Sequence, residues 1–582
     1  MATLNDQLEQ VFRSAVTAAL GDDYAGTDPQ IRPTGDPKFG DYQANLAMNL
    51  AKQLNQKPRQ VAKAIVEHIS AAGLVQSLEI AGPGFINITI HSNALNQLAA
   101  DMLEHPKLGI DKPEQPKRIV VDYSSPNVAK EMHVGHLRST VIGDAIVRVL
   151  DFQGHDVIRQ NHLGDWGTQF GMLLEHLVDL GVRPHDTPPD VADLNRFYQD
   201  AKKKFDAEPE FADRSRKRVV AMQSLDNDTI LLWQILVDES KKHFFGVYNK
   251  LGVMLEESDI RAESQYNNDL HSVIDQLKAT GHLQESLGAT VVYPEGFTDR
   301  DGKPMPMIVQ KTDGGYLYAT TDLAAARYRI TQLQAQRIIY VTDSRQAQHF
   351  AMVFQTLQQT GWATGNVRLD HVPFGTILGP DRKPFKTRSG ETIKLIDLID
   401  EALSRARAVI EQKNPDLDDA LKAEIADTVG IGALKYADLC NDRIKDYVFD
   451  WNRMLALDGN TAPYLQNAYV RVRSIFRKGE IDPDSLPGAM IQVDAPAERL
   501  LVLKLLQFNQ VIDSVADSLE PHRLCTFLYE LATLLHQFYE QCPVLTAPDK
   551  TTKNSRLAIC HLVGRTLETG LSLLGIDIVQ QM

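Results

Sequence analysis

Hydrophobic and polar positions in the first 110 residues recur over short segments that predict a small α/β domain. Apolar residues stand at helical spacing near the start, at Leu4, Leu8, Val11, Phe12 and Ala15. A second helix is predicted over 58–69, where proline occupies the first turn, and the alternating stretch 85–90 predicts a strand. The polar segment 111–117 contains two prolines and marks a boundary, so we expect a first domain over residues 1–112.

Strand and helix patterns alternate between residues 113 and 395. The apolar run 118–123 predicts a buried strand, and 133–152 predicts the helix that follows it. Further strands are predicted at 157–158, 290–293, 307–310, 338–341 and 369–374. This alternation predicts a Rossmann-like, doubly wound parallel sheet, with the charged and mostly helical stretch at about 185–260 inserted into it.

Strand patterns disappear after about residue 390, and helical segments follow one another from 395 to 582. We expect a helical connecting region over 396–460 and an all-helical domain over 461–582. The predicted class is therefore α/β, with a parallel-sheet domain between a small N-terminal α/β domain and an all-α C-terminal domain.

Composition agrees with several globular domains, because 582 residues are too many for one core, and 43% apolar and 24% charged residues are ordinary values. The four cysteines form no CxxC pair, which favours a reducing compartment and gives no zinc site. The sequence shows no secretory signal and no run of about 18 uncharged apolar residues. We therefore expect a cytoplasmic protein with no membrane partner.

The overall charge is acidic, with 61 Lys and Arg against 76 Asp and Glu, a net charge of −15. This balance counts against a non-specific nucleic-acid binder but leaves room for a local basic patch. Residues 466–478 form such a patch, with four basic residues and no acid, and helical spacing places Arg471 and Lys478 on one face.

The segment 125–136 lies between the predicted strand and helix, at the edge of a parallel sheet where nucleotides bind. His133 and His136 stand three residues apart, so both project from the first turn and can donate to phosphate oxygens. Gly135 leaves room for an adenine or a ribose. Taken alone, the pattern is equally consistent with two surface histidines.

Two further segments rich in glycine add to this motif. Residues 161–171 contain three glycines and Asp165, and are a candidate second wall of a nucleotide site. The basic loop 375–390 is suited to transfer of a phosphoryl or adenylyl group. Neither GxxxxGK[ST] nor GxGxxG occurs, which argues against P-loop and dinucleotide sites.

Together the motifs resemble those of class I aminoacyl-tRNA synthetases. HVGH and the downstream KTRSG resemble the HIGH and KMSKS elements of that class, and SPNVAKEMHVGHLRS with HLGDWGTQFG is similar specifically to arginyl-tRNA synthetases. The resemblance extends to 40–48, 82–88, 439–475 and 570–582. It implies a monomer that uses ATP with Mg²⁺ to activate L-arginine as arginyl-adenylate, and then esterifies the terminal adenosine of the tRNA for arginine.

The resemblance also assigns roles to residues. The catalytic set is Lys130, His133, Gly135, His136, Lys386 and Arg388. The residues implied to bind ATP are His133, Gly135, His136, Gly164, Asp165, Trp166, Gly167, Gln169, Gly375 and Leu378. Those implied to bind arginine are Asn127, His136, Glu263, Tyr318, Asp322 and Gln346. Those implied to bind tRNA, by a domain at the elbow and by the C-terminal anticodon-binding domain, are Phe85, Asn87, Tyr469, Arg471, Lys478, Tyr539 and Met582.

The KMSKS-like element lacks its second lysine, and in related enzymes the lysine before HIGH is thought to supply that charge. The matching residue is Lys130, which leaves the division of work between Lys130, Lys386 and Arg388 open. Chemistry supports the arginine pocket, because a planar, permanently charged guanidinium requires carboxylates and flat acceptors. Tyr318 and Asp322 stand at i and i+4, on one helix face.

Several alternatives remain open. The candidate stacking residues at the anticodon, Tyr469, Phe538 and Tyr539, are equally consistent with core packing, and each acid taken alone is more simply a surface group. A different HxGH nucleotidyltransferase, such as a cytidylyltransferase, would leave the long helical C-terminal half unexplained. A non-catalytic tRNA-binding relative is disfavoured because Lys130, His133, His136 and Asp322 are all present.

Overall fold

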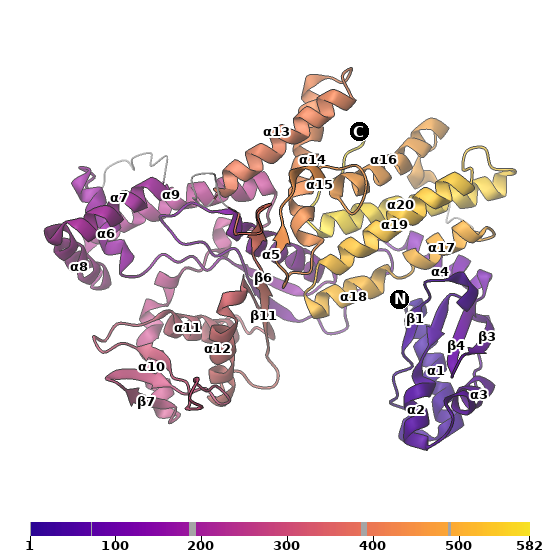
Figure 1. Ribbon diagram of the computed structural model, residues 1–582, viewed down its shortest axis with the longest axis horizontal. Helices are drawn as coiled ribbons and strands as arrows, with labels where there is room; N and C mark the ends of the chain where they lie inside the picture. The colour runs from indigo at the N-terminus through magenta and orange to yellow at the C-terminus, as the bar shows by residue number, and fades with distance from the viewer. Residues whose placement is uncertain (1, 72, 185–193, 386–392, 487–490, 582) are drawn as a thin grey trace.

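The computed structural model describes residues 2–581 except 72, 185–193, 386–392 and 487–490, so the predicted site residues Lys386, Arg388 and Met582 lie outside the described residues. The N-terminal domain lies at one end of the molecule, helices of the predicted insertion lie at the other, and the parallel sheet lies between them (Figure 1). In the described part of the chain, no helix is both long and apolar enough to cross a membrane.

The N-terminal domain is a four-stranded antiparallel sheet with helices packed on it. The sheet order is β1 (Ile31–Pro33), β2 (Tyr42–Ala44), β4 (Phe85–Ile90) and β3 (Val75–Ala81). The helices are α1 (Leu4–Leu20), α2 (Leu46–Leu54), α3 (Pro58–Glu67) and α4 (Ser92–Glu104). A capping box between Thr3 and Asp6 starts α1, whose buried face confirms the predicted helix.

The central sheet is parallel, with the strand order β11 (Arg368–Phe374), β10 (Arg337–Asp343), β5 (Arg118–Asp122) and β6 (Asp156–Gln160). These four strands confirm the predicted sheet. Helix α5 (Val134–Phe152) leads from β5 to β6, and the chain later returns to β10 on the other side of β5. The carboxyl ends of β5 and β10 therefore flank a topological switch point, the place where such sheets bind ligands.

The strands predicted at 290–293 and 307–310 do not belong to this sheet, and that prediction is wrong. They are β8 (Ala289–Val292) and β9 (Met307–Gln310), which form a separate antiparallel sheet with β7 (Leu283–Ser286). A tight turn at Leu287 and Gly288, both with positive φ, joins β7 to β8, so no crossover helix is needed. With α10 (Asn267–Ala279), α11 (Tyr318–Thr331) and α12 (Ala347–Gln359), these strands build a lobe around its own apolar core.

Helices also form the predicted insertion, as far as its residues are described. They are α7 (Leu194–Ala207), α8 (Pro209–Gln223) and α9 (Asn227–Leu251), which pack against α6 (Gln169–Asp179). Glu175 of α6, buried in this group, accepts hydrogen bonds from Arg214 and Arg218 of α8. The insertion is thereby fixed to the helix that follows the glycine-rich segment 161–171.

The C-terminal part is helical. Its helices are α13 (Leu395–Lys413), α14 (Asp419–Leu439), α15 (Trp451–Met454), α16 (Ala462–Gly479), α17 (Pro496–Leu505), α18 (Phe508–Ser518), α19 (His522–Gln541) and α20 (Lys550–Leu573). The two-residue strand β13 (Tyr447–Val448) pairs with β12 (Ile377–Leu378). Arg499 of α17 binds Asp41, and Arg565 of α20 donates to carbonyl oxygens after α4, so the N-terminal domain docks on these helices.

Candidate active site

The two histidines of the HVGH motif shape the start of α5. The backbone N–H of His133 donates to Nδ1 of His136, and the N–H of Gly135 donates to Nδ1 of His133, both at 3.0 Å. The ring centroids lie 4.0 Å apart. Because each Nδ1 accepts a hydrogen bond, the neutral form of each ring carries its proton on Nε2.

Both rings are held in this neutral form. Burial, followed by the charge of His133, lowers the pKa of His136 to about 3. Burial and the charges of Lys130 and Arg345 also lower the pKa of His133. At physiological pH the pair therefore presents two neutral Nε2–H donors at a helix N-terminus, which suits an anionic phosphate.

The packing of the His133 ring explains why residue 135 is a glycine. A Cβ at this position would lie 2.8 Å from Cε1 of the His133 ring, so a side chain here would displace the capping histidine. The predicted space for an adenine or a ribose stays a prediction. The glycine is required in either case for the arrangement of the two rings.

Two cations lie close to the histidines. Lys130 places its Nζ 4.4 Å from the ring centroid of Tyr198 on α7. Arg345 follows the carboxyl end of β10 and binds Asp343 through Nε and Nη2 at 2.8 and 2.7 Å. Sequence reasoning missed Arg345, although its position beside Gln346 at the end of a central strand was an available signal.

The glycine-rich segment 161–171 is fixed against the first motif. A Cβ at Gly164 would lie 2.2 Å from Oδ1 of Asn127, so only glycine allows these two segments to meet as they do. The buried carboxylate of Asp165 accepts from the N–H and the hydroxyl of Ser264 at 2.9 and 2.7 Å. Asp165 thus anchors the residue next to Glu263; direct contact of Asp165 with ATP stays a prediction.

A cavity of about 1130 Å³ lies between the insertion helices and the lobe that carries α11. It brings together five of the predicted site residues: Trp166, Gly167, Gln169, Glu263 and Tyr318. Tyr198, the partner of Lys130, also lines it, and so do the cationic residues Lys202, Arg216 and Lys311. The cavity therefore extends from Glu263 and Tyr318 of the candidate arginine pocket to Tyr198, the aromatic partner of Lys130.

Glu263 carries the most informative pKa in this cavity. Burial raises it to about 8, with further contributions from the negative charges of Asp322 and Asp165. Two carboxyl groups that repel each other across a buried space favour a cation between them. A guanidinium provides that charge together with donors for both carboxylates.

Tyr318 and Asp322 lie on one face of α11, as predicted, and both contact His349 of α12. Nε2 of His349 lies 2.6 Å from Oδ2 of Asp322, and its ring centroid lies 4.8 Å from that of Tyr318. Gln346 is exposed at the start of α12. His349 was missed because it stands 27 residues from Asp322, and only the packing of α12 on α11 brings the two together.

The basic loop is anchored on its N-terminal side by β12. Gly375 donates to the carbonyl of Arg443, and a Cβ there would lie 2.6 Å from Oδ1 of Asp446; Leu378 pairs with Val448. The loop that carries Lys386 and Arg388 therefore starts from a strand fixed to the helical connecting region.

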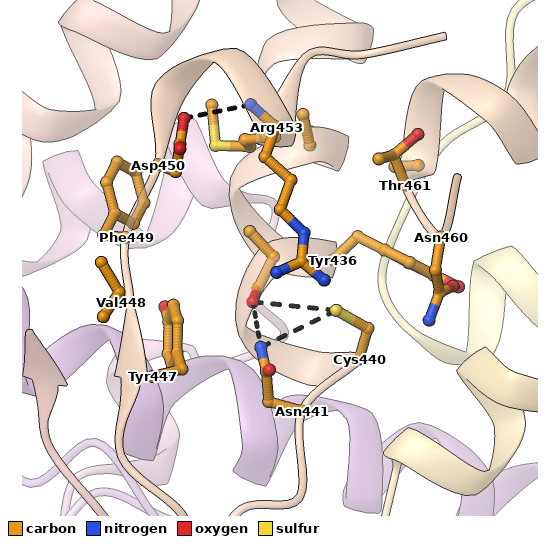
Figure 2. A pocket seen from close by; sticks show the side chains of 14 residues that line it. Tyr436, Cys440, Asn441, Tyr447, Val448, Phe449, Asp450, Arg453, Asn460 and Thr461 are labelled. Carbon is orange, nitrogen blue, oxygen red and sulfur yellow. Dashed lines mark hydrogen bonds between the residues drawn. The ribbon is translucent and has the colours of Figure 1, made fainter. Parts of the chain in front are cut away.

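A second cavity, of about 280 Å³, lies beside β13, whose residues Tyr447 and Val448 line it (Figure 2). In it, the guanidinium of Arg453 points towards Cys440.

Comparisons with known proteins identify the family. The descriptions "Arginyl tRNA synthetase N terminal domain", "tRNA synthetases class I (R), catalytic domain" and "DALR anticodon binding domain" match residues 6–90, 97–451 and 465–582. The arginine–tRNA ligase of Thermobifida fusca is 51% identical over 582 residues, 100% of both chains. The chain belongs to the arginine–tRNA ligase family. The ligase of Synechococcus sp. is 48% identical over 589 residues, again covering 100% of both chains.

Solved structures of the arginine–tRNA ligase family agree in fold. Arginyl-tRNA synthetase from Plasmodium falciparum superposes with a TM-score of 0.87 at 30% identity, and 100% of both chains is covered. The enzyme from Thermus thermophilus gives 0.82 at 25% identity and covers 99% of this chain and 100% of its own. These comparisons confirm the predicted three-part fold class.

For an arginine–tRNA ligase, the candidate tRNA contacts differ in accessibility. Lys478 is exposed, and Arg471 contacts His536 while its guanidinium lies 5.5 Å from the ring centroid of Tyr539. Tyr539 is 43% exposed and can meet a base, whereas Tyr469 is 3% exposed. The expectation that Tyr469 stacks on a base therefore conflicts with its burial between helices, and the core-packing alternative explains it.

The N-terminal candidates for tRNA contact lie on β4. Phe85 is half-buried, but Asn87 is buried and its side-chain oxygen accepts from Gln43 at 2.8 Å. The conformation described here leaves Asn87 little surface with which to reach a tRNA. Direct contact by Phe85 stays a prediction.

Proposed function

We propose that this chain charges the tRNA for arginine in two steps. A carboxylate oxygen of arginine attacks the α-phosphorus of ATP, which forms arginyl-adenylate as pyrophosphate leaves. The 2′-hydroxyl of the terminal adenosine then attacks the arginyl carbonyl carbon, AMP leaves, and the hydroxyl proton is released. The observation that carries this proposal is the full-length similarity to arginine–tRNA ligases. The coupled carboxyl groups of Glu263 and Asp322, and the histidine pair at the start of α5, support it.

Catalysis in this proposal consists of positioning and electrostatic stabilisation, without a covalent enzyme intermediate. The Nε2–H groups of His133 and His136 donate to phosphate oxygens. Lys130 supplies positive charge, as does Arg345, which follows the carboxyl end of β10. Glycine-rich residues after β6 form the wall of the nucleotide site. Lys386 and Arg388 act on the leaving pyrophosphate from the loop that β12 anchors.

Arginine enters the large cavity with its guanidinium between Glu263 and Asp322. Tyr318 and Gln346 complete the pocket, and Asn127 holds the amino-acid backbone. ATP arrives as its Mg²⁺ complex, a co-substrate; in the described part of the chain no group of three or more His, Cys, Asp or Glu side chains could hold a metal ion. We further propose a cytoplasmic monomer with domains 1–112, 113–395, 396–460 and 461–582.

A charging assay tests the proposed function. Total tRNA is incubated with the protein, ATP and each of the common amino acids in turn. The proposal expects esterification with arginine alone. Charging with another amino acid, or none with arginine, would overturn it, and CTP-dependent transfer would favour the cytidylyltransferase alternative.

Arginine binding should release a proton near neutral pH. The Glu263 carboxyl is mostly protonated below its pKa of about 8, and an adjacent guanidinium favours its ionised form. Arginine affinity should therefore rise up to about tenfold per pH unit between pH 6.5 and 8. Calorimetry in buffers of different ionisation enthalpy measures the proton directly. Glu263→Gln is the control that binds without release, and an equal heat in all buffers for the wild type would contradict the assignment.

The basic face of α16 should contribute to tRNA affinity through phosphates. Changing Arg471 and Lys478 to glutamine should flatten the salt dependence of tRNA binding by roughly one slope unit per contact. The arginine KM should stay unchanged. Filter binding over a range of salt concentrations measures the slope, and Lys278→Gln with Lys303→Gln, equal charge changes on the distant lobe, is the matched control. A slope equal to that of the control would show that these charges only face solvent.

Activation of arginine should depend on tRNA, because the basic element Lys386-Thr-Arg-Ser is incomplete and the acceptor end can order the site by induced fit. ATP–pyrophosphate exchange with arginine should be negligible until cognate tRNA is added. The control is tRNA whose terminal ribose has been oxidised by periodate, which cannot accept arginine. Strong exchange without any tRNA would contradict this expectation and leave the enzyme assignment intact.

A further inference from the structure

His349 contacts two residues of the proposed arginine pocket, Asp322 and Tyr318. It stands in the first turn of α12, and its Nε2 lies 2.6 Å from Oδ2 of Asp322. The side chains of both residues are 17% exposed, so the contact is mostly shielded from water. The ring of His349 also meets the Tyr318 ring edge to face, with centroids 4.8 Å apart. One side chain therefore supports two neighbouring walls of the pocket.

The ring of His349 is itself fixed by packing behind the pocket. Its centroid lies 5.2 Å from that of Phe350, which in turn stacks on His371 of β11 at 5.1 Å. His371 is held by a 2.8 Å contact between its Nε2 and the hydroxyl of Thr342 on β10. This aromatic row connects the pocket to two strands of the central sheet. A ring supported in this way has little freedom to leave its carboxylate partner.

The geometry points to His349 as a positioning residue that sets selectivity for arginine. An N–H donated to Oδ2 of Asp322 fixes the plane of that carboxylate and leaves Oδ1 to accept from the substrate. The edge contact holds Tyr318 beside it. A planar fork of donors matches a carboxylate whose plane is fixed better than one that rotates, and this orientation favours guanidinium over ammonium. The inference rests on the proposed function of the cavity as an arginine site.

Three variants of His349 separate positioning from simple packing. His349→Phe keeps a ring and loses the donor, His349→Asn keeps polarity but is too short to reach Asp322, and His349→Gln places an amide N–H near the position of Nε2. The first two should raise the arginine KM about tenfold or more, the scale of one lost hydrogen bond to a charged group. The value of kcat should change less than about twofold, and the KM for ATP should stay constant. His349→Gln should restore most of the arginine KM.

A cycle with Asp322→Asn completes the test. If His349 acts through Asp322, its replacement should add little once the carboxylate is gone. Wild-type charging with arginine is measured first, so loss of the proposed function itself would be recognised separately. An arginine KM within twofold of wild type for His349→Asn, in a protein with unchanged melting temperature, would overturn the inference. The inference would also be overturned if the separate increases in arginine KM caused by the His349 and Asp322 changes simply multiplied in the double variant.

Discussion

Replacing His136 by alanine is expected to lower the rate of arginine activation by about 100-fold or more, the scale of losing one oriented donor at a charged transition state. The structure gives the reason. Nδ1 of His136 accepts the N–H of His133, so the neutral ring presents its Nε2–H to a ligand. The measurement is ATP–pyrophosphate exchange in the presence of tRNA, with arginine and ATP saturating.

A second variant separates chemistry from helix capping. Alanine also removes the acceptor for His133 N–H, which costs about 1 kcal/mol at a helix start. His136→Asn retains an acceptor at that position and lacks the distal nitrogen. It should melt like the wild type and still be as inactive as the alanine variant. Activity close to wild type in His136→Asn would assign the histidine to capping alone.

Changing Asp322 to asparagine is expected to raise the arginine KM by at least about 100-fold. The substitution keeps the shape of the side chain and removes one partner of a shielded ion pair, a loss of about 3–5 kcal/mol. The KM for ATP should be nearly unchanged, because the proposed phosphate contacts, His133 and His136, lie at the start of α5 and not on α11. Steady-state aminoacylation measures both constants.

The matched control for Asp322→Asn is Asp275→Asn, an exposed carboxylate on α10 of the same lobe. It removes the same charge from the same lobe and should leave the arginine KM as it is. An increase in the arginine KM of both variants would show that losing any negative charge from this lobe weakens arginine binding. An unchanged arginine KM in Asp322→Asn would assign the guanidinium contact to Glu263 and not to Asp322.

The sequence predicted the two central strands of the parallel sheet, β5 and β10, well because each contains a short apolar run. Ile119, Val120 and Val121 are almost fully buried, as such a run requires. The same kind of run cannot distinguish parallel from antiparallel pairing, and so β8 and β9 were assigned to the wrong sheet. Their separate lobe depends on a two-residue turn and on a core shared with α10 and α11.

The candidate site was predictable where chemistry is local to one motif. His133 and His136 are three residues apart, and the helix start alone brings their rings together. Contacts between distant segments were not predictable. Examples are the contact of His349 with Asp322 and the hydrogen bond that Ser264 donates to Asp165. Helical spacing likewise places Tyr469 on a face of α16, but only the neighbouring helices decide that this face is buried.

We infer that two carboxyl groups, Glu263 in the large cavity and Asp322 coupled to it, select the positive charge of arginine. Citrulline tests it most directly, because its ureido group has the planar shape of a guanidinium without the charge. The measurement is the ratio of kcat/KM for arginine to that for citrulline, in wild type and in Asp322→Asn. We expect a wild-type ratio of about 10⁴ or more, as for a site built around buried polar groups, and a much smaller ratio in the variant. An equal ratio in both proteins would contradict it.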